Sequence, residues 1–87
     1  MNTNLDTLEI QILLKCYEKP VNRTYITRTF FRHKIDDREK ALSKLIESNL
    51  IISRKMPKPG AAKIPIFYQI TDEGKKWISN YLEHYPT

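Results

Sequence analysis

The stretch LIISRKMPKPGAAKIPIFYQIT, residues 50–71, decides the fold of this chain. Two runs rich in β-branched and aromatic residues stand at its ends, and a segment with Pro57, Pro59 and Gly60 separates them. Strand-forming runs on both sides of such a segment predict a β-hairpin with a long loop. Lys58 and Lys63 lie in this loop and make it basic.

The residues before the hairpin predict a helix that begins near Asp37 and ends at about Asn49. Asp36 is followed three residues later by Glu39. At this spacing each side chain can accept a hydrogen bond from a free backbone N–H at a helix start. Asn49 can adopt the left-handed backbone conformation that ends many helices. We expect three side chains of this helix to face the core: Leu42, Leu45 and Ile46.

Two further helices are predicted upstream. The first spans residues 5–19 and stops before Pro20, because proline disfavours a helical conformation in the residue before it. Its apolar surface is wider than one core face needs, so part of it is either buried in the centre of the domain or faces a partner. A short second helix begins with Thr24 as its cap and continues to about Phe31. Two helices separated by a few residues indicate a helix-turn-helix.

The C-terminal stretch TDEGKKWISNYLEHY predicts a last helix, capped by Thr71 or Asp72. Trp77, Tyr81 and Tyr85 are spaced four residues apart and share one face of this helix. They either cover the hairpin or form an interface with a second copy, since aromatic residues are enriched at interface centres. We expect Trp77 to point inward and the two tyrosines to be partly shared with a partner.

Length and composition limit what the chain can be. With 87 residues and 40% hydrophobic content, we expect one globular domain over residues 1–87. The N-terminus lacks the pattern of a secretory signal and no apolar run is long enough to span a bilayer, so we expect a cytoplasmic protein that does not enter a membrane. One cysteine and two distant histidines predict no metal site and no cofactor. No nucleophile, acid–base or phosphate-binding motif is evident, so an enzyme is not expected.

Charge is distributed unevenly along the chain. Between Lys19 and Lys63 there are twelve basic and four acidic residues, a net charge of +8, whereas the remainder carries −3, which together give the total of +5. A basic middle between mildly acidic ends favours an anionic partner such as nucleic acid. The alternative is that these lysines and arginines only keep the chain soluble.

Three segments together resemble the winged helix-turn-helix fold of MarR-like and PadR-like transcriptional regulators. In those families the recognition helix ends in a Leu-x-x-x-Gly-Leu-Ile pattern, and LIESNLI, residues 45–51, is similar except that Asn49 replaces the glycine. The basic loop of the hairpin resembles the wing. FYQITDEGKKWI, residues 67–78, is similar to the Tyr-x-Leu-Thr-x-x-Gly sequence that closes the wing and begins the next helix. The resemblance implies an α+β fold with a three-helix core, a two-stranded β-hairpin wing and a C-terminal helix.

By this resemblance the chain is a sequence-specific regulator that binds double-stranded DNA, with its third helix in the major groove. At 100° per residue, the side of that helix opposite Leu42 and Leu45 carries the expected base or groove contacts. These are Lys40, Ser43 and Lys44, with Arg38 ranked below them. Expected backbone contacts from the second helix are Arg23, Thr27, Arg28 and Arg32. Expected wing contacts are Arg54, Lys55, Lys58 and Lys63.

The resemblance also suggests a homodimer, in the simplest case a repressor, on a roughly palindromic operator. The first and last helices would form its interface, through Leu5, Leu8, Tyr81 and Tyr85. Two alternatives stay open. The wing can be a basic loop that prevents edge pairing, and the whole domain can be a protein-docking module, which the acidic start of the third helix would suit.

Overall fold

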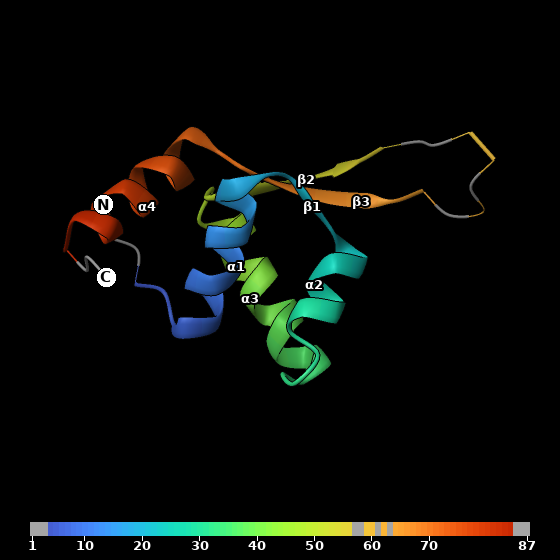
Figure 1. The fold of residues 1–87 in the computed structure, drawn as a ribbon, viewed down its shortest axis with the longest axis horizontal. Coiled ribbons are helices and arrows are strands. Elements are labelled where there is room, and N and C mark those ends of the chain that lie inside the picture. Colours follow the sequence, from blue (N-terminus) through green and yellow to red (C-terminus); the bar gives the residue numbers. More distant parts are fainter. Residues whose placement is uncertain (1–3, 57–58, 61, 63, 85–87) are drawn as a thin grey trace.

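The computed structural model describes residues 4–56, 59–60, 62 and 64–84, and these form four helices and a three-stranded antiparallel sheet. The elements in chain order are α1 (Thr7–Glu18), β1 (Val21–Asn22), α2 (Arg23–Thr29), α3 (Ile35–Glu47), β2 (Ile51–Lys55), β3 (Ile66–Ile70) and α4 (Asp72–His84). Figure 1 shows α1, α2 and α3 gathered below the sheet, with the β2–β3 hairpin extending to one side and α4 to the other. The predicted α+β class, the three-helix core, the hairpin and the C-terminal helix are confirmed.

The sheet has the strand order β1-β3-β2. The hairpin pairs Ile51 with Ile70 at its base and Lys55 with Ile66 farther out. Two strands were expected, and the third, β1, was missed. It consists of only two residues, and it pairs with the hairpin through Val21 opposite Tyr68.

The core forms around α1, which packs against α3, α4 and β3. Ile12 and Leu13 are fully buried in it, and so are Leu45 of α3, Ile51 of β2 and Ile78 of α4. The wide apolar surface of α1 is explained in large part by this central position. Leu14 is partly buried against the core, whereas Tyr17 is 45% exposed.

The beginnings of α2 and α3 differ from the prediction. The cap of α2 is Asn22, whose side-chain oxygen accepts a hydrogen bond from the Tyr25 backbone N–H at 2.7 Å, and not Thr24. α3 begins at Ile35, two residues earlier than expected, and its capping residue Lys34 forms no side-chain hydrogen bond. The expected pairing of Asp36 with Glu39 is therefore wrong, because the helix already includes both residues.

The predicted end of α3 is confirmed. Asn49 has a φ angle of 59°, in the left-handed region. Its N–H donates to the Ile46 carbonyl and the Leu50 N–H donates to the Leu45 carbonyl, each at 2.9 Å. These are the two bonds with which a left-handed residue closes a helix. Ile46, expected to face inward, is 39% exposed.

Thr71 and Gly74 join the hairpin to α4 and to the end of α3. The Thr71 hydroxyl lies 2.6 Å from the Asn49 carbonyl oxygen and 3.0 Å from that of Leu50, and it accepts a hydrogen bond from the Gly74 N–H at 3.0 Å. Of the two expected caps of α4, Thr71 is therefore the one used. A Cβ atom at Gly74 would lie 2.2 Å from the Leu50 carbonyl oxygen and 2.6 Å from an Ile70 side-chain carbon. Only glycine lets the first turn of α4 approach this closely.

Candidate nucleic-acid interface

α3 has one outward face that is polar and free of core contacts. Ala41, Leu42 and Leu45 are buried on its inner side. At 100° per residue, the opposite side carries Lys40 and Ser43, and both are exposed. Asp36 and Glu47 lie on the same exposed side. Lys40 and Ser43 thus lie where a duplex could reach them.

Lys44 points away from this face toward α1. Its Nζ lies 2.6 Å from the backbone carbonyl oxygen of Asn4 and 3.2 Å from Oε1 of Glu9. The Glu9 carboxylate also accepts the backbone N–H of Asp6, which in turn caps α1 by accepting the Glu9 N–H. Lys44 therefore ties α3 to the start of α1. Because the Lys44 side chain is still 45% exposed, its expected contact with bases stays a prediction.

Arg38 is buried in the connection between α2 and α3. Its side chain is among the core residues of α3, and one guanidinium nitrogen, Nη1, donates to the carbonyls of His33 at 2.6 Å and Phe30 at 3.1 Å. One terminal nitrogen of this buried cation is therefore engaged by backbone oxygens inside the fold. The expected groove contact of Arg38 stays a prediction.

Arg23 also forms contacts within the protein. It pairs with the carboxylate of Glu39 on α3, and its Nη1 donates to the hydroxyl of the buried Tyr68 on β3 at 3.1 Å. Arg23 thus connects α2 to α3 and to the sheet. Its side chain remains 47% exposed, so one edge of it stays accessible beside these contacts.

The other expected backbone contacts lie on the outside of α2 and just after it. Thr27, Arg28 and Arg32 are exposed. The Thr27 hydroxyl donates to the Arg23 carbonyl at 3.1 Å, which holds it against its own helix. The Arg32 guanidinium lies 5.8 Å from the centre of the Phe31 ring, within the range of a cation–π contact.

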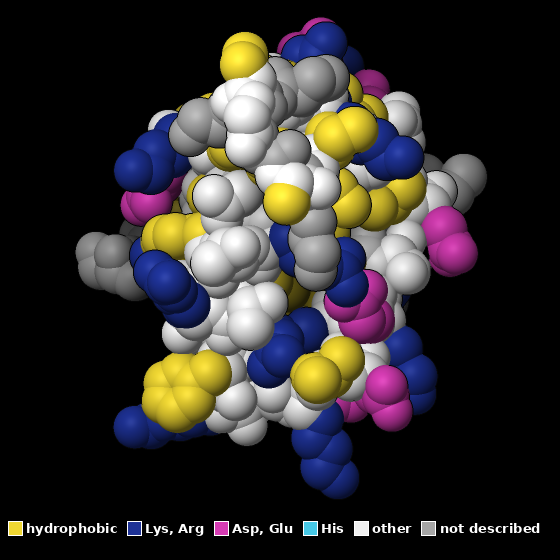
Figure 2. Space-filling model, turned by 90° about the vertical axis from the view of Figure 1, so that its right-hand side faces the viewer, with side chains coloured by type: hydrophobic (Ala, Val, Ile, Leu, Met, Phe, Trp, Pro, Cys, Tyr) yellow, Lys and Arg dark blue, Asp and Glu magenta, His cyan; other side chains and the backbone are white. Residues whose placement is uncertain are grey.

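The hairpin carries exposed cations close to the sheet. Arg54 and Lys55 on β2 are exposed, and Arg54 donates to the side-chain oxygen of Gln69 on β3 at 3.1 Å. The two loop lysines, Lys58 and Lys63, lie outside the described residues. Seen from the hairpin side, Lys and Arg side chains are spread over the surface among hydrophobic and acidic ones (Figure 2).

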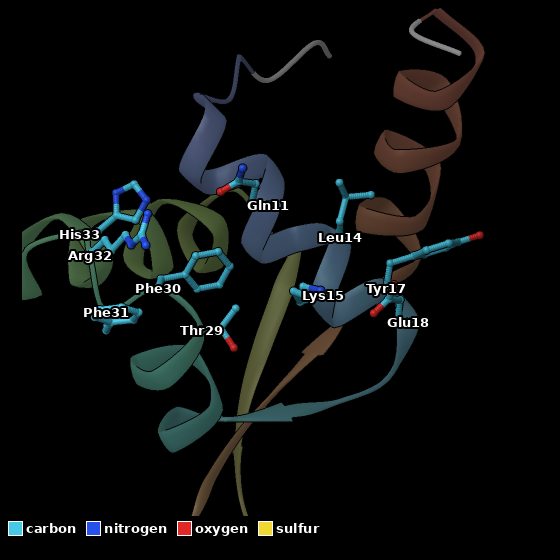
Figure 3. Close-up of a pocket in the computed structure, with 10 residues that line it drawn as sticks. All are labelled: Gln11, Leu14, Lys15, Tyr17, Glu18, Thr29, Phe30, Phe31, Arg32 and His33. Carbon is cyan, nitrogen blue, oxygen red and sulfur yellow. The ribbon is translucent and has the colours of Figure 1, made fainter. Parts of the chain in front are cut away.

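A cleft of about 940 Å³ lies between α1 and the connection from α2 to α3 (Figure 3). Lys15 and Tyr17 belong to its α1 wall, and Phe30, Phe31 and His33 to the other. In the part of the chain that is described, no three His, Cys, Asp or Glu side chains form a group that could hold a metal ion. None of the helices within that part is long and apolar enough to cross a membrane.

Three solved structures are similar to this one. The adhesin competence repressor AdcR from Streptococcus pyogenes is 17% identical, with a TM-score of 0.73 over 95% of this chain and 59% of its own. ZitR from Lactococcus lactis, a zinc-responsive member of the MarR family, is 20% identical, with a TM-score of 0.68 over 95% of this chain and 62% of its own. The ST1889 protein from the archaeon Sulfolobus tokodaii is 27% identical, with a TM-score of 0.60 over 92% of this chain and 75% of its own. Neither a protein-family model nor a curated protein matches the sequence.

This chain has the winged helix-turn-helix fold. α2 and α3 form the helix-turn-helix, α3 is in the position of the recognition helix, and the β2–β3 hairpin is the wing. The chain spans about three fifths of the length of AdcR and ZitR. The similarity therefore shows that this chain shares the fold of these proteins.

The residues expected at a dimer interface differ in how deeply they are buried. Leu8 is 8% exposed and belongs to the core, and its expected place in an interface stays a prediction. Leu5 is partly buried against the same core. Tyr81 stacks on Trp77, with ring centres 5.5 Å apart, and both are partly buried. Tyr85 lies outside the described residues.

Sequence reasoning missed the side chains that hold the recognition helix in place. Glu9 is 5% exposed although it is charged, and the spacing of Asp6 and Glu9 is the same capping pattern that we looked for at Asp36. This signal was available in the sequence. Tyr68 gave no comparable signal, because its bond to Arg23 joins residues 45 positions apart.

Proposed function

We propose that this chain is a sequence-specific transcriptional regulator that binds double-stranded DNA. The observation that carries the proposal is the arrangement of exposed polar groups on α3 between two cationic elements. Lys40 and Ser43 form part of the open face of α3. The segments on both sides of α3 in the chain contribute exposed cations: Arg28 from α2, Arg32 from the α2–α3 connection, and Arg54 and Lys55 from the wing. Figure 1 places α2 and the hairpin on the same side of α1.

In this proposal α3 enters the major groove, where each base pair presents its own pattern of donors and acceptors. Lys40 and Ser43 read base edges or the nearest phosphates. Arg28 and Arg32, with Thr27 and the exposed edge of Arg23, contact the backbone and fix the register without reading sequence. Arg54 and Lys55, and by extension Lys58 and Lys63, lie along the neighbouring backbone or minor groove, where each phosphate contact releases counterions.

The acidic residues at the start of α3 fit this arrangement through the helix itself. Asp36 and Asp37 are in its first turn, where negative side chains are stabilised by the partial positive charge of the helix N-terminus. Glu39 is compensated by Arg23. Part of the negative charge on α3 is therefore compensated within the protein itself.

We further propose that residues 1–87 act as one domain in the cytoplasm, and that two copies bind a roughly palindromic operator as a repressor. Two-fold pairing would separate the two recognition helices by about 34 Å, one turn of DNA. With Leu8 in the core, such a dimer uses the outer surfaces of α1 and α4. Tyr17 is 45% exposed and Leu82 is 46% exposed on these helices, which supplies apolar surface for it.

A second candidate function is a protein-docking module. Phe31 and Ile35 are 68% and 66% exposed, and they flank the α2–α3 connection. Exposed apolar side chains beside Asp36 and Asp37 suit a protein surface with apolar and basic groups. DNA would bind this end of the molecule less favourably, because the two carboxylates repel phosphates.

The deciding experiment titrates a labelled duplex from the region upstream of the protein's own gene, and a random duplex, at two salt concentrations. A DNA-binding regulator binds the upstream duplex more tightly, with affinity that falls steeply as salt rises. R28Q and R32Q should each weaken both duplexes and lower the salt slope by about one. K75Q, on exposed α4, serves as the control that removes a charge elsewhere. Absence of binding at low salt would reject this function in favour of the docking module.

A further inference from the structure

We propose that Arg38 is a positioning residue for DNA recognition: it fixes the angle between α2 and α3, and through it the direction in which Lys40 and Ser43 point. This inference rests on the proposed function. It assigns to an arginine of the recognition helix a role that involves no contact with DNA.

The contacts of Arg38 all lead to one segment. Its side chain donates to the carbonyls of Phe30 and His33, and its backbone N–H donates to the carbonyl of Lys34 at 3.1 Å. Phe30 is the C-cap of α2 and Lys34 the N-cap of α3. One residue thus binds the end of the first helix, the connection and the start of the second.

Phe30 anchors the start of the connection in the hydrophobic core, but the connection has few other polar contacts. Lys34, the N-cap residue of α3, forms no side-chain hydrogen bond with the start of this helix. Within the described residues, the only backbone bond inside the connection is the one from the His33 N–H to the Phe30 carbonyl, at 3.0 Å. His33, Phe31 and Arg32 are exposed. Arg38 is therefore the main polar link between the connection and the core side of α3.

The electrostatics of the site match this role. Among the residues that the structure describes, no carboxylate forms an ion pair with Arg38. Its charge is instead stabilised by the carbonyl groups where α2 ends, which carry partial negative charge. Because these oxygens belong to the backbone, the guanidinium fixes the course of the chain. A side-chain partner could move without moving the helix.

A small rotation of α3 has a large effect on recognition. Lys40 lies two residues after Arg38, on the opposite side of the same helix. A hydrogen bond to a base edge tolerates only a narrow range of distance and angle. Loosening the α2–α3 connection should therefore reduce sequence preference before it reduces attraction to phosphates, which depends only weakly on geometry.

The test compares R38M with R28Q, because both remove one positive charge. Methionine fills a similar length of apolar space and leaves the carbonyls without the guanidinium. We expect R38M to lower the affinity ratio between the preferred and random duplexes by about tenfold, the scale of one lost base contact. Its salt slope should remain that of the unchanged protein. R28Q should keep the ratio and lower the slope by about one.

Two results would overturn the role of Arg38. If R38M lowers the salt slope as R28Q does, Arg38 contacts a phosphate. If R38M keeps the affinity ratio, the connection is held without it. R38K, which retains the charge and can still donate to a carbonyl, should recover part of the ratio and provides a second variant if R38M unfolds.

Hydrogen exchange of the free protein keeps this test separate from the proposed function. In R38M, amides of residues 30–37 should exchange faster than in the unchanged protein, while those of α4 keep their rates. This result would support the role of Arg38 in fixing the α2–α3 connection even if no duplex binds. In that case the proposed function is rejected and the role of Arg38 in the fold is not. Unchanged exchange in residues 30–37 would reject the positioning role whatever the DNA titrations give.

Discussion

Lys44 on α3 and Glu9 on α1 form an ion pair, with Nζ 3.2 Å from Oε1, across the contact between α3 and the central helix. The Glu9 side chain is 7% exposed and that of Lys44 is 45% exposed. A carboxylate that is buried this far depends on its partners, because removal of one leaves the other desolvated and poorly compensated. Lys44 therefore contributes to the fold.

K44M should lower the free energy of unfolding by about 1 kcal/mol, a value at the low end for such pairs because Lys44 is half exposed. Urea denaturation at neutral pH measures it. K40M is the matched control on the exposed face of the same helix and should stay within about 0.5 kcal/mol of the unchanged protein. Equal stabilities of the two variants would contradict the role of the ion pair.

K40A should change which base pairs the protein prefers, and S43A should do so to a smaller extent. Loss of one side-chain contact to a base edge removes about 1–3 kcal/mol of discrimination at that position. Selection of bound duplexes from a random pool would show relaxed preference at one or two positions. K75A, an exposed lysine of α4, should leave the selected sequence unchanged. A selected sequence that is the same for K40A and K75A would remove Lys40 from the reading face.

G74A should destabilise the protein by more than about 2 kcal/mol. Its added methyl group would lie 2.2 Å from the Leu50 carbonyl oxygen, and this oxygen belongs to a backbone that cannot move without disturbing the end of α3. Thermal or urea unfolding measures the loss. G60A is the control without a clash: no atom lies within 4 Å of an added Cβ there, and only the φ of 78° adds backbone strain. A smaller loss for G74A than for G60A would contradict this packing.

Stability should fall in alkaline solution because of Cys16. Burial raises the pKa of its thiol from 9.0 to about 12. The folded pKa lies above the unfolded one, so this contribution is complete below pH 9 and is lost as the pH rises toward 12. Between pH 8 and pH 10 the loss should be about 1 kcal/mol in excess of that in C16A, which cannot ionise there. If the two proteins lose equal stability over this interval, the thiol is not the cause.

Local patterns predicted the parts of the fold that depend on local chemistry. The hairpin follows from strand-forming residues on both sides of proline and glycine, and the end of α3 follows from Asn49, because few other residues adopt a φ of 59° at low cost. The resemblance to winged helices rested in part on Thr71 and Gly74, within the segment of residues 67–78. The structure gives the physical reason, which is the close approach of α4 to the Leu50 carbonyl.

The internal contacts of the candidate site were not predicted, because a helical wheel gives the face of a side chain and not the neighbour that it reaches. Arg38 and Lys44 were assigned to DNA on their charge and position. Both bind oxygens contributed by segments that pack against α3, at separations of 5 to 40 residues, which the wheel did not reveal. Long cationic side chains can extend along a helix to such groups. The strand β1 escaped prediction for a related reason, since two residues carry no periodic pattern and its partner lies on β3.

Asn22 belongs to two elements at once: its backbone pairs with Phe67 of the wing, and its side chain caps α2. Asn22 therefore links the hairpin directly to the start of α2. If the chain binds DNA as proposed, the distance between its two outer backbone contacts is a fixed property of the protein. Binding of such a molecule would depend on the helical pitch of the duplex. We expect it to discriminate against duplexes that are wound too tightly or too loosely, even where every base that α3 reads is correct.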